Sequence, residues 1–259
     1  MNCTRLLLAM TWCVVIAPGL AHAALSDEIQ VYTDDINEPR KTGLELHVNT
    51  TPKGRRTPDY PGEVVPNHGL RITPEFSYGL TETWEAGLYI PTNRDAAGNF
   101  DVAGAKLRLK WLPIRGDEET GGWYLGANAE LSHQKQKFSE SRWTSELRII
   151  MGHRGTEWLL GGNILLGWNL SDGLGSATPE FEVVLKAARK VSERLALGLE
   201  YYSVLGTTGR IAPWSEQDNA IYVTADYETK SWGINFGVGR GITNASDRWT
   251  VKAIFGVPF

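Results

Sequence analysis

The stretch WTVKAIFGVPF, residues 249–259, decides the fold that this sequence predicts. Every second residue from Trp249 to Phe259 is apolar, whereas most residues between them are small or polar. An alternation with a period of two is typical of a β-strand that has one apolar face. The stretch has no polar tail, although chain termini usually fray into water. We therefore expect a strand whose apolar face lies against lipid.

The same alternation recurs in further segments along the chain. They lie at residues 44–49, 70–76, 84–90, 105–111, 123–132, 143–151, 158–168, 180–187, 195–201, 221–227 and 232–238. Alternating segments of about ten residues, separated by turn residues, are typical of transmembrane barrels. The sequence therefore predicts an all-β fold, a transmembrane antiparallel up-and-down β-barrel of about 12 strands.

The connections between these segments alternate between long and short. The long ones lie at 50–67, 92–101, 133–142, 169–178, 206–218 and 241–247, and the short ones at 79–83, 113–121, 152–156, 188–194 and 228–231. An even number of strands brings both termini to the periplasmic side of the bacterial outer membrane. We therefore expect the long connections to be extracellular loops and the short ones to be periplasmic turns.

Three residues leave the strand count open. Pro74 lies within a predicted strand, where it would remove a hydrogen bond of the ladder. Leu159 and Leu165 would lie on the polar face of their strand. Ten strands or a shifted register remain alternatives, and a soluble periplasmic β-sandwich is the alternative fold.

The spacing of Trp158 and Trp168 favours the membrane interpretation. They share one face of a predicted strand, and their separation along it is roughly 33 Å at the usual rise per residue. A tilt of roughly 40° reduces this to about 25 Å of height, the thickness of the apolar band between aromatic girdles. Trp249 and Phe259 repeat the spacing.

The first residues carry the pattern of a secretory signal peptide. Arg5 precedes an apolar run at 6–20, and Ala-His-Ala at 21–23 is a small-residue cleavage site. Cys3 and Cys13 both lie before that site. The exported part is therefore predicted to contain no disulfide and no thiol site.

Three parts are expected: a signal peptide at 1–23, a periplasmic N-terminal lead-in at 24–40, and the barrel at 41–259. The acidic, irregular lead-in could instead fold into the barrel mouth, and the sequence does not decide between these placements. The chain carries 26 Lys and Arg against 30 Asp and Glu, a net charge of −4. This balance lacks the basic footprint of a nucleic-acid-binding protein.

The polar faces of the predicted strands carry most of their charges, which a barrel would turn toward its lumen. The candidate lumen-lining residues are Glu45, His47, Arg71, Glu75, Glu85, Lys106, Arg108, Lys110, Glu130, Glu146, Arg148, Glu180, Glu182, Lys186, Glu200, Asp226 and Lys252. Acids and bases are close to balanced, which argues against strong ion selectivity. Two interpretations remain open: a structural salt-bridge network, because unpaired charges in a narrow lumen are costly, or a polar path for a solute.

No catalytic, cofactor-binding or metal-binding residues are predicted, and we expect a protein that is not an enzyme. The histidines share no metal-ligand spacing, and neither H-E-x-x-H nor G-x-S-x-G occurs. The remaining enzyme hypothesis is an outer-membrane hydrolase that pairs His133 with Ser132 or Ser139 near the rim.

Two stretches suggest macromolecular partners. The first long loop is basic and rich in proline, and its Lys53, Arg55 and Arg56 are candidates for contacts with lipopolysaccharide phosphates. The strand that ends in Phe259 is expected to engage the barrel-assembly machinery. Outer-membrane lipids and a small-molecule solute complete the expected partners.

A short pattern follows the predicted periplasmic turns. Its clearest copy is YGLTETWEAGL at 78–88, and weaker copies lie at 191–199 and 228–234. The pattern resembles the outer-membrane barrel family of meta-pathway phenol-degradation transporters, whose members show a similar Tyr-Gly-Leu-Thr turn before an alternating strand with Gly-Leu. The resemblance implies a barrel that passes small, often aromatic, compounds, and it brings no site residues to transfer.

These features predict a barrel in a Gram-negative outer membrane that passes small solutes, aromatic or hydrophobic ones among them, without covalent chemistry. The alternative is a structural or ligand-binding barrel with a plugged, salt-bridged lumen. The two hypotheses differ in whether the lumen is open, which the alternation of residues does not reveal.

Overall fold

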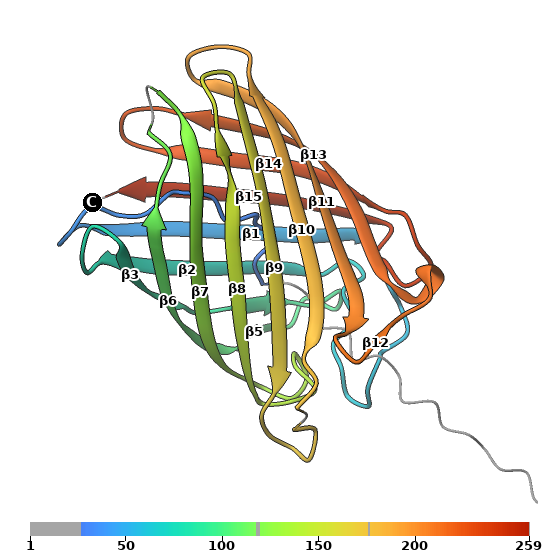
Figure 1. Cartoon of the computed structure of the whole chain (residues 1–259). Helices are drawn as coiled ribbons and strands as arrows, with labels where there is room; N and C mark the ends of the chain where they lie inside the picture. The colour runs from blue at the N-terminus through green and yellow to red at the C-terminus, as the bar shows by residue number, and fades with distance from the viewer. Residues whose placement is uncertain (1–26, 118–119, 176, 259) are drawn as a thin grey trace, which may run out of the picture.

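The computed structural model describes residues 27–117, 120–175 and 177–258 and forms a β-barrel (Figure 1). Its strands are β1 (Thr42–Lys53), β2 (Leu70–Gly79), β3 (Trp84–Tyr89) with its continuation β4 (Thr92–Arg94), β5 (Phe100–Val102) leading into β6 (Gly104–Ile114), β7 (Gly122–Gln134), β8 (Trp143–Arg154), β9 (Trp158–Asn169), β10 (Glu180–Lys190), β11 (Leu195–Thr207), β13 (Asp218–Glu228), β14 (Gly233–Gly241) and β15 (Trp249–Pro258). The short strand β12 (Arg210–Ile211) and the 3-10 helix η1 (Trp214–Glu216) lie in one connection.

Every pairing in the barrel wall is antiparallel, and apart from the pairing of β1 with β15 that closes the barrel, each joins consecutive strands of the wall. The sheet closes because β1 pairs with β2 on one side and with β15 on the other. With β4 and β5 taken as continuations of β3 and β6, the wall has 12 strands. The predicted all-β, 12-stranded antiparallel barrel is confirmed, and the ten-stranded and sandwich alternatives are wrong. The predicted signal peptide and Phe259 lie outside the described residues.

Pro74 lies in the middle of β2, opposite a break in the neighbouring strand. Its carbonyl accepts the N–H of Ile90 at 3.0 Å, and Ile90 is one of the residues that separate β3 from β4. In an antiparallel ladder the N–H and C=O of one residue face the same neighbour. The donor that Pro74 lacks is therefore missing where the ladder is already interrupted, so the strand tolerates the proline.

The connections divide the barrel into two ends. The longer loops, at 54–69, 95–99, 135–142, 170–179, 208–217 and 242–248, define the loop end, and the shorter connections, at 80–83, 115–121, 155–157, 191–194 and 229–232, define the turn end. The expected alternation of long and short connections is present except at 95–99, which is shorter than the turn-end connection 115–121. Each strand of the wall therefore connects the loop end to the turn end.

Three turns of the turn end share one hydrogen-bond pattern. The hydroxyl oxygen of Thr81 accepts the N–H of Trp84, that of Ser192 accepts the N–H of Leu195, and that of Thr229 accepts the N–H of Trp232. Each hydroxyl satisfies a backbone donor that the tight turn leaves without a ladder partner. The repeated sequence pattern at 78–88, 191–199 and 228–234 thus has a local structural cause.

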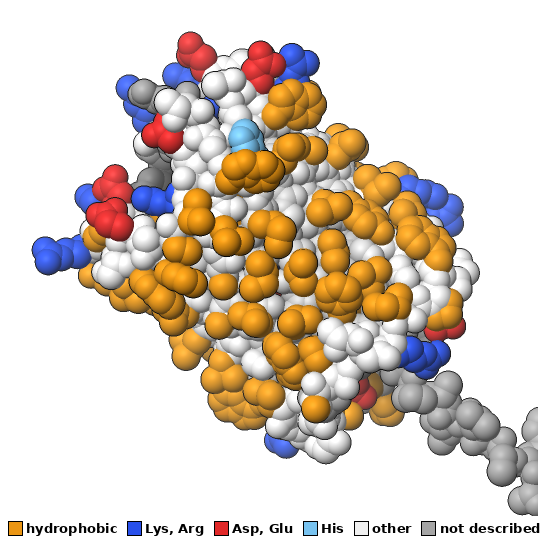
Figure 2. Space-filling view, in the orientation of Figure 1, with side chains coloured by type: hydrophobic (Ala, Val, Ile, Leu, Met, Phe, Trp, Pro, Cys, Tyr) orange, Lys and Arg blue, Asp and Glu red, His pale blue; other side chains and the backbone are white. Residues whose placement is uncertain are grey.

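The outer wall is apolar. Figure 2 shows hydrophobic side chains across the strand-covered face, whereas charged side chains gather toward its ends. Leu107 and Val223 are 59% and 65% exposed on this wall. Trp158 and Trp168 lie near opposite ends of β9, as their spacing predicts. Within the described residues, no helix has the length and apolar character needed to cross a membrane.

Candidate functional site: the barrel lumen

Residues 27–40, here called the lumen segment, run inside the barrel. Ile29, Val31 and Tyr32 are buried although they belong to no strand. Asp27 lies toward the loop end, where its carbonyl accepts a hydrogen bond from the Asn49 side chain. The described part of the expected periplasmic lead-in therefore lies in the lumen, because the wall offers it apolar and polar partners there.

Two apolar clusters hold the lumen segment against the wall. In one, Val31 packs with Leu165 and Val184. The other consists of Tyr32, Leu112, Tyr124 and Ile150, with Ile36 and Leu159 at its edge. Leu159 and Leu165 face inward because the segment covers them, so these two residues do not indicate a register shift.

Wall side chains also bond the backbone of the lumen segment. Asn163 accepts the N–H of Tyr32 at 2.8 Å and donates to its C=O at 2.9 Å. Lys252 donates to the C=O of Ile29 at 2.9 Å, and Arg148 to that of Gln30 at 3.2 Å. Because the segment has no ladder of its own here, these side chains satisfy backbone groups that would otherwise be buried without partners.

The segment is tied again at the turn end. Asp34 forms an ion pair with Arg154, and the Asn37 side chain donates to the Ser77 hydroxyl at 2.7 Å. A Cβ atom on Gly79 would lie 2.1 Å from the carbonyl oxygen of Glu38. The glycine of the YGLT turn is therefore required by the close passage of the segment's backbone.

Three basic residues follow one another on the inner face of β6, namely Lys106, Arg108 and Lys110. They lie in the lumen among acidic residues of β2, β3, β7 and the lumen segment. Lys106 contacts Glu130 at 3.0 Å and Glu28 of the lumen segment at 3.2 Å. Arg108 contacts Glu75 at 2.8 Å, and both Arg108 and Lys110 contact Glu85. Paired charges of this kind lower the cost of burying them.

A second network lies across the lumen. Lys252, which has no exposed side-chain surface, is paired with Glu200. Lys186 contacts Glu200 at 3.4 Å and Asp226 at 3.0 Å. Arg148 is paired with Glu146 at 3.0 Å.

The remaining predicted lumen residues also face inward. Arg71 is buried and lies 6.0 Å from the centre of the Phe138 ring. Glu180 and Glu182 line a cavity at the loop end. The structure thus places all 17 candidate lumen-lining residues on the inner side of the wall, but it distributes them into separate groups.

Glu45, His47 and Glu75 form one such group, with ligand atoms within 4.8 Å of one another. His47 Nε2 lies 3.1 Å from Glu75 and 3.7 Å from Glu45. Arg108 already occupies the other oxygen of Glu75, which would oppose a metal ion by charge. The alternation in β1 places Glu45 and His47 on one face, but only the pairing of β1 with β2 brings Glu75 to them.

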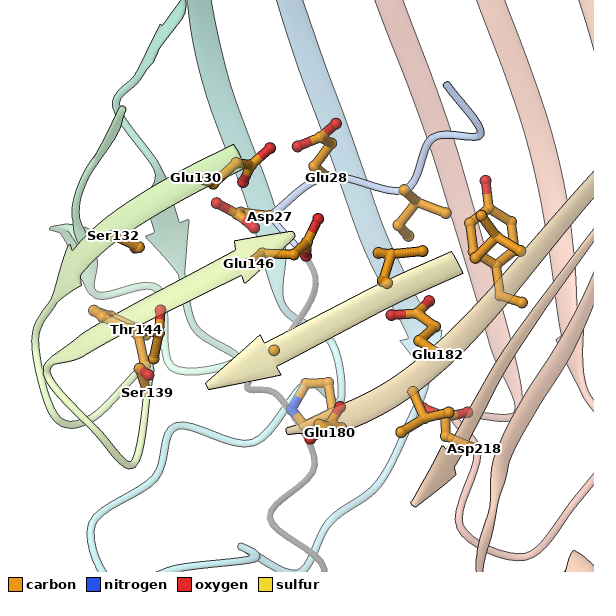
Figure 3. A pocket seen from close by; sticks show the side chains of 18 of the residues that line it. Asp27, Glu28, Glu130, Ser132, Ser139, Thr144, Glu146, Glu180, Glu182 and Asp218 are labelled. Carbon is orange, nitrogen blue, oxygen red and sulfur yellow. The ribbon is translucent and has the colours of Figure 1, made fainter. Parts of the chain in front are cut away.

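The loop end of the lumen holds a cavity of about 590 Å³. Its walls come from the lumen segment, β7, β8, β10 and β13, as the labelled side chains of Figure 3 show. Nine Asp and Glu residues line it against five Lys and Arg residues, so this part of the lumen is acidic. The near balance counted over all strands therefore hides a separation of charge along the lumen.

The arrangement of His133 does not support the hydrolase hypothesis. Ser132 is buried on the inner face of β7, whereas His133 is exposed on the outer face and packs against the Trp143 ring at 4.6 Å. The hydroxyl of Ser139 donates to the carbonyl of Ser141. A histidine on the outer face cannot activate a serine on the inner one, since a base must reach the proton that it accepts.

Comparison with known proteins identifies the fold. An outer-membrane channel from Pseudomonas putida F1 matches with a TM-score of 0.59 at 15% identity, over 90% of this chain and 100% of that one. The KdgM porin matches with a TM-score of 0.53 at 9% identity, over 84% and 98%. No protein-family model and no curated protein matches the chain, so the narrower resemblance to phenol-degradation transporters has no such support. The shared fold is that of outer-membrane barrels.

Proposed function

We propose that this protein is a channel of the bacterial outer membrane for small solutes and that the lumen segment gates it. The observation that carries the proposal is the position of residues 27–40 inside a wall lined with charge. A wall that only had to enclose a core would be apolar on its inner face. Here charged and amide side chains of the inner wall, among them Lys252, Arg148 and Asn163, bond the segment, so a wall without the segment would still present polar groups to water and solute.

The contacts of the segment are of a kind that can be broken. Val31 and Tyr32 bury apolar area in two small clusters, and the other contacts are hydrogen bonds and ion pairs, which water could replace only once the segment has left the lumen. The apolar outer wall supports a position in the outer membrane, with lipid and lipopolysaccharide as neighbours. Arg55 is paired with Asp59 and Glu63, so Lys53 and Arg56 are the better candidates for lipopolysaccharide.

The solute class remains part of the proposal. The resemblance to phenol-degradation transporters favours small aromatic or hydrophobic compounds. The cavity has both apolar and charged walls, which favours a solute with an apolar body and a polar group. Assembly through the strand that ends in Phe259 stays a prediction.

A disulfide lock tests the gate. The sequence after the expected cleavage site has no cysteine, so Val31→Cys with Val184→Cys introduces a single pair, at two residues that pack together. Single-channel currents in planar bilayers are expected to be rare in the oxidised double variant and to return to the wild-type level after reduction. The two single-cysteine variants serve as controls and should not respond to reductant.

Two results would oppose the proposal. Equal currents from the oxidised and reduced double variant would show that the segment is not the gate. Folded protein that never conducts, even after the double variant is reduced or the segment is weakened, would favour the alternative, a plugged structural or binding barrel. The many contacts of the segment are the observation that supports this alternative.

A further inference from the structure

A row of carboxylates crosses the acidic side of the cavity. Glu130 of β7 lies directly opposite Glu146 of β8, and Glu146 and Glu180 both lie opposite Gly167 of β9. Neighbouring strands are about 4.8 Å apart, so Glu146 and Glu180 are about 10 Å apart across a residue without a side chain. Like charges directly opposite one another destabilise a sheet, so this row needs cations.

The chain itself neutralises only part of the row. Lys106 contacts Glu130, and Arg148 contacts Glu146. Among the described residues, the carboxylates of Glu180 and Glu182 form neither an ion pair nor a side-chain hydrogen bond, and both line the cavity. They follow each other on one face of β10, about 6.6 Å apart. One ammonium group between them can bond both carboxylates.

A second observation points to the same cavity. The Glu28 side chain is 3% exposed and lines the cavity, and its Oε1 has no hydrogen-bond partner. Its other oxygen contacts Lys106 at 3.2 Å, so Oε1 is left to accept a hydrogen bond from a group that enters the cavity, and a buried acceptor of this kind is costly to leave without one. Figure 3 shows Glu28 on the lumen segment and Glu182 on β10, both among the side chains that line this space.

The geometry points to a binding site for a small organic cation in this cavity, with its ammonium group between Glu180 and Glu182. Leu165 lies opposite Glu182 in the sheet and Val184 follows Glu182 on the same face, so the apolar cluster that these two residues form with Val31 borders this part of the cavity. A Cβ on Gly167 would meet only Glu180, at 3.8 Å, so the space above it is open. The role of this site in transport rests on the proposed channel. The existence of the site does not, since binding can be measured without conduction.

The charges of the cavity favour a cation over an anion or a zwitterion. Lys106 is surrounded by Asp27, Glu28 and Glu130, and Arg148 by Glu146 and the carbonyl of Gln30. An anion near the carboxylate row would have to compete with those contacts, whereas a cation there meets the carboxylates of Glu180 and Glu182, which have no ion pair among the described residues.

Isothermal titration calorimetry of the protein folded in detergent tests the site, with benzylammonium as the probe and benzoate as the matched anion. The variant is Glu180→Gln with Glu182→Gln, and Glu193→Gln with Glu216→Gln removes the same charge from exposed positions. The wild type and the control are expected to bind benzylammonium and not benzoate. The lumen variant should bind it about tenfold more weakly or worse, the size of effect that loss of a charge-assisted hydrogen bond produces.

The outcomes separate this site from the channel. If the protein binds benzylammonium but does not conduct, the cation site is supported and the channel is contradicted. If the protein conducts but does not bind benzylammonium, the channel is supported and the cation site is contradicted. The site is also overturned if the lumen variant binds as the wild type does, or if potassium at equal concentration displaces benzylammonium. A heat-induced shift in gel mobility and a β-rich circular dichroism spectrum verify that each variant is folded.

Discussion

The side chain of Asn163 bonds both backbone groups of Tyr32, as a neighbouring strand would. Its Oδ1 accepts the Tyr32 N–H at 2.8 Å, and its Nδ2 donates to the Tyr32 C=O at 2.9 Å. Asn163 is 1% exposed, so water does not compete for these bonds. One inward-facing amide on β9 thus fixes the register of the lumen segment against the wall.

Asn163→Ala should loosen the lumen segment. The change leaves a buried N–H and C=O without partners, and each such group costs about 1–3 kcal/mol. We expect faster hydrogen exchange at the Tyr32 amide and more frequent openings in planar bilayers. Asn235→Ala is the matched control, because Asn235 also faces the lumen but bonds Asp226 on the wall. Unchanged exchange at Tyr32 would contradict the role given to Asn163.

Gly79→Ala should displace the lumen segment at the turn end. The new methyl group would lie 2.1 Å from the carbonyl oxygen of Glu38, which is backbone and must move. Overpacking of this kind costs about 1–3 kcal/mol. Gly167→Ala is the control, because its Cβ meets nothing closer than 3.8 Å. Trypsin cleavage after Arg40 or Lys41 should accelerate in the first variant only, and equal cleavage in both would refute the assignment.

The sequence predicts the wall well because strand faces are a local property. The period-two pattern of apolar and polar residues identifies the inward-facing charges. The spacing of the strands shows that long loops and short turns follow one another in alternation. Pro74, Leu159 and Leu165 were the exceptions to the pattern, and each marks a tertiary feature. The proline lies at the break between β3 and β4, and the leucines lie under the lumen segment.

The contents of the lumen could not be predicted in the same way. The lumen segment has no alternation, and its main partner is distant in sequence: Tyr32 and Asn163 are 131 positions apart. The acidic row depends on register, since only the pairing of β8, β9 and β10 aligns Glu146 with Glu180. A count of charges over all strands is close to balance and cannot reveal this grouping.

Asp247 should make the loop end less stable as the pH rises from about 4 to above 6. Burial raises the pKa of Asp247 from 3.8 to about 6, with Asp218 and Asp59 adding to the rise and Arg55 opposing it. The folded state then holds a proton that the unfolded chain releases, so the contribution of Asp247 to stability is greatest below about pH 4 and falls as the pH rises through 6. The loss should be about 1–3 kcal/mol.

Asp247→Asn tests this, because the amide keeps the oxygen that accepts the Arg55 N–H at 2.8 Å. Relative to the wild type, the variant should gain stability between pH 4 and pH 7 in denaturant titrations. A constant difference between the two proteins across that range would show that Asp247 titrates at its ordinary pKa.

Lys252→Met should be strongly destabilising, whereas Lys252→Met with Glu200→Gln should recover much of the loss. The Lys252 side chain is fully buried and the Glu200 side chain is 1% exposed. Removing one partner leaves a buried charge and typically costs about 3–5 kcal/mol, but a neutral pair of similar volume avoids that cost. Lys186 lies 3.4 Å from Glu200 and would still balance part of its charge. The loss of stability in Lys252→Met should therefore lie at the lower end of that range. Urea titrations of the wild type, both single variants and the double variant measure the coupling. Equal losses in Lys252→Met and the double variant would mean that the destabilisation comes from the lost bond to the Ile29 carbonyl instead.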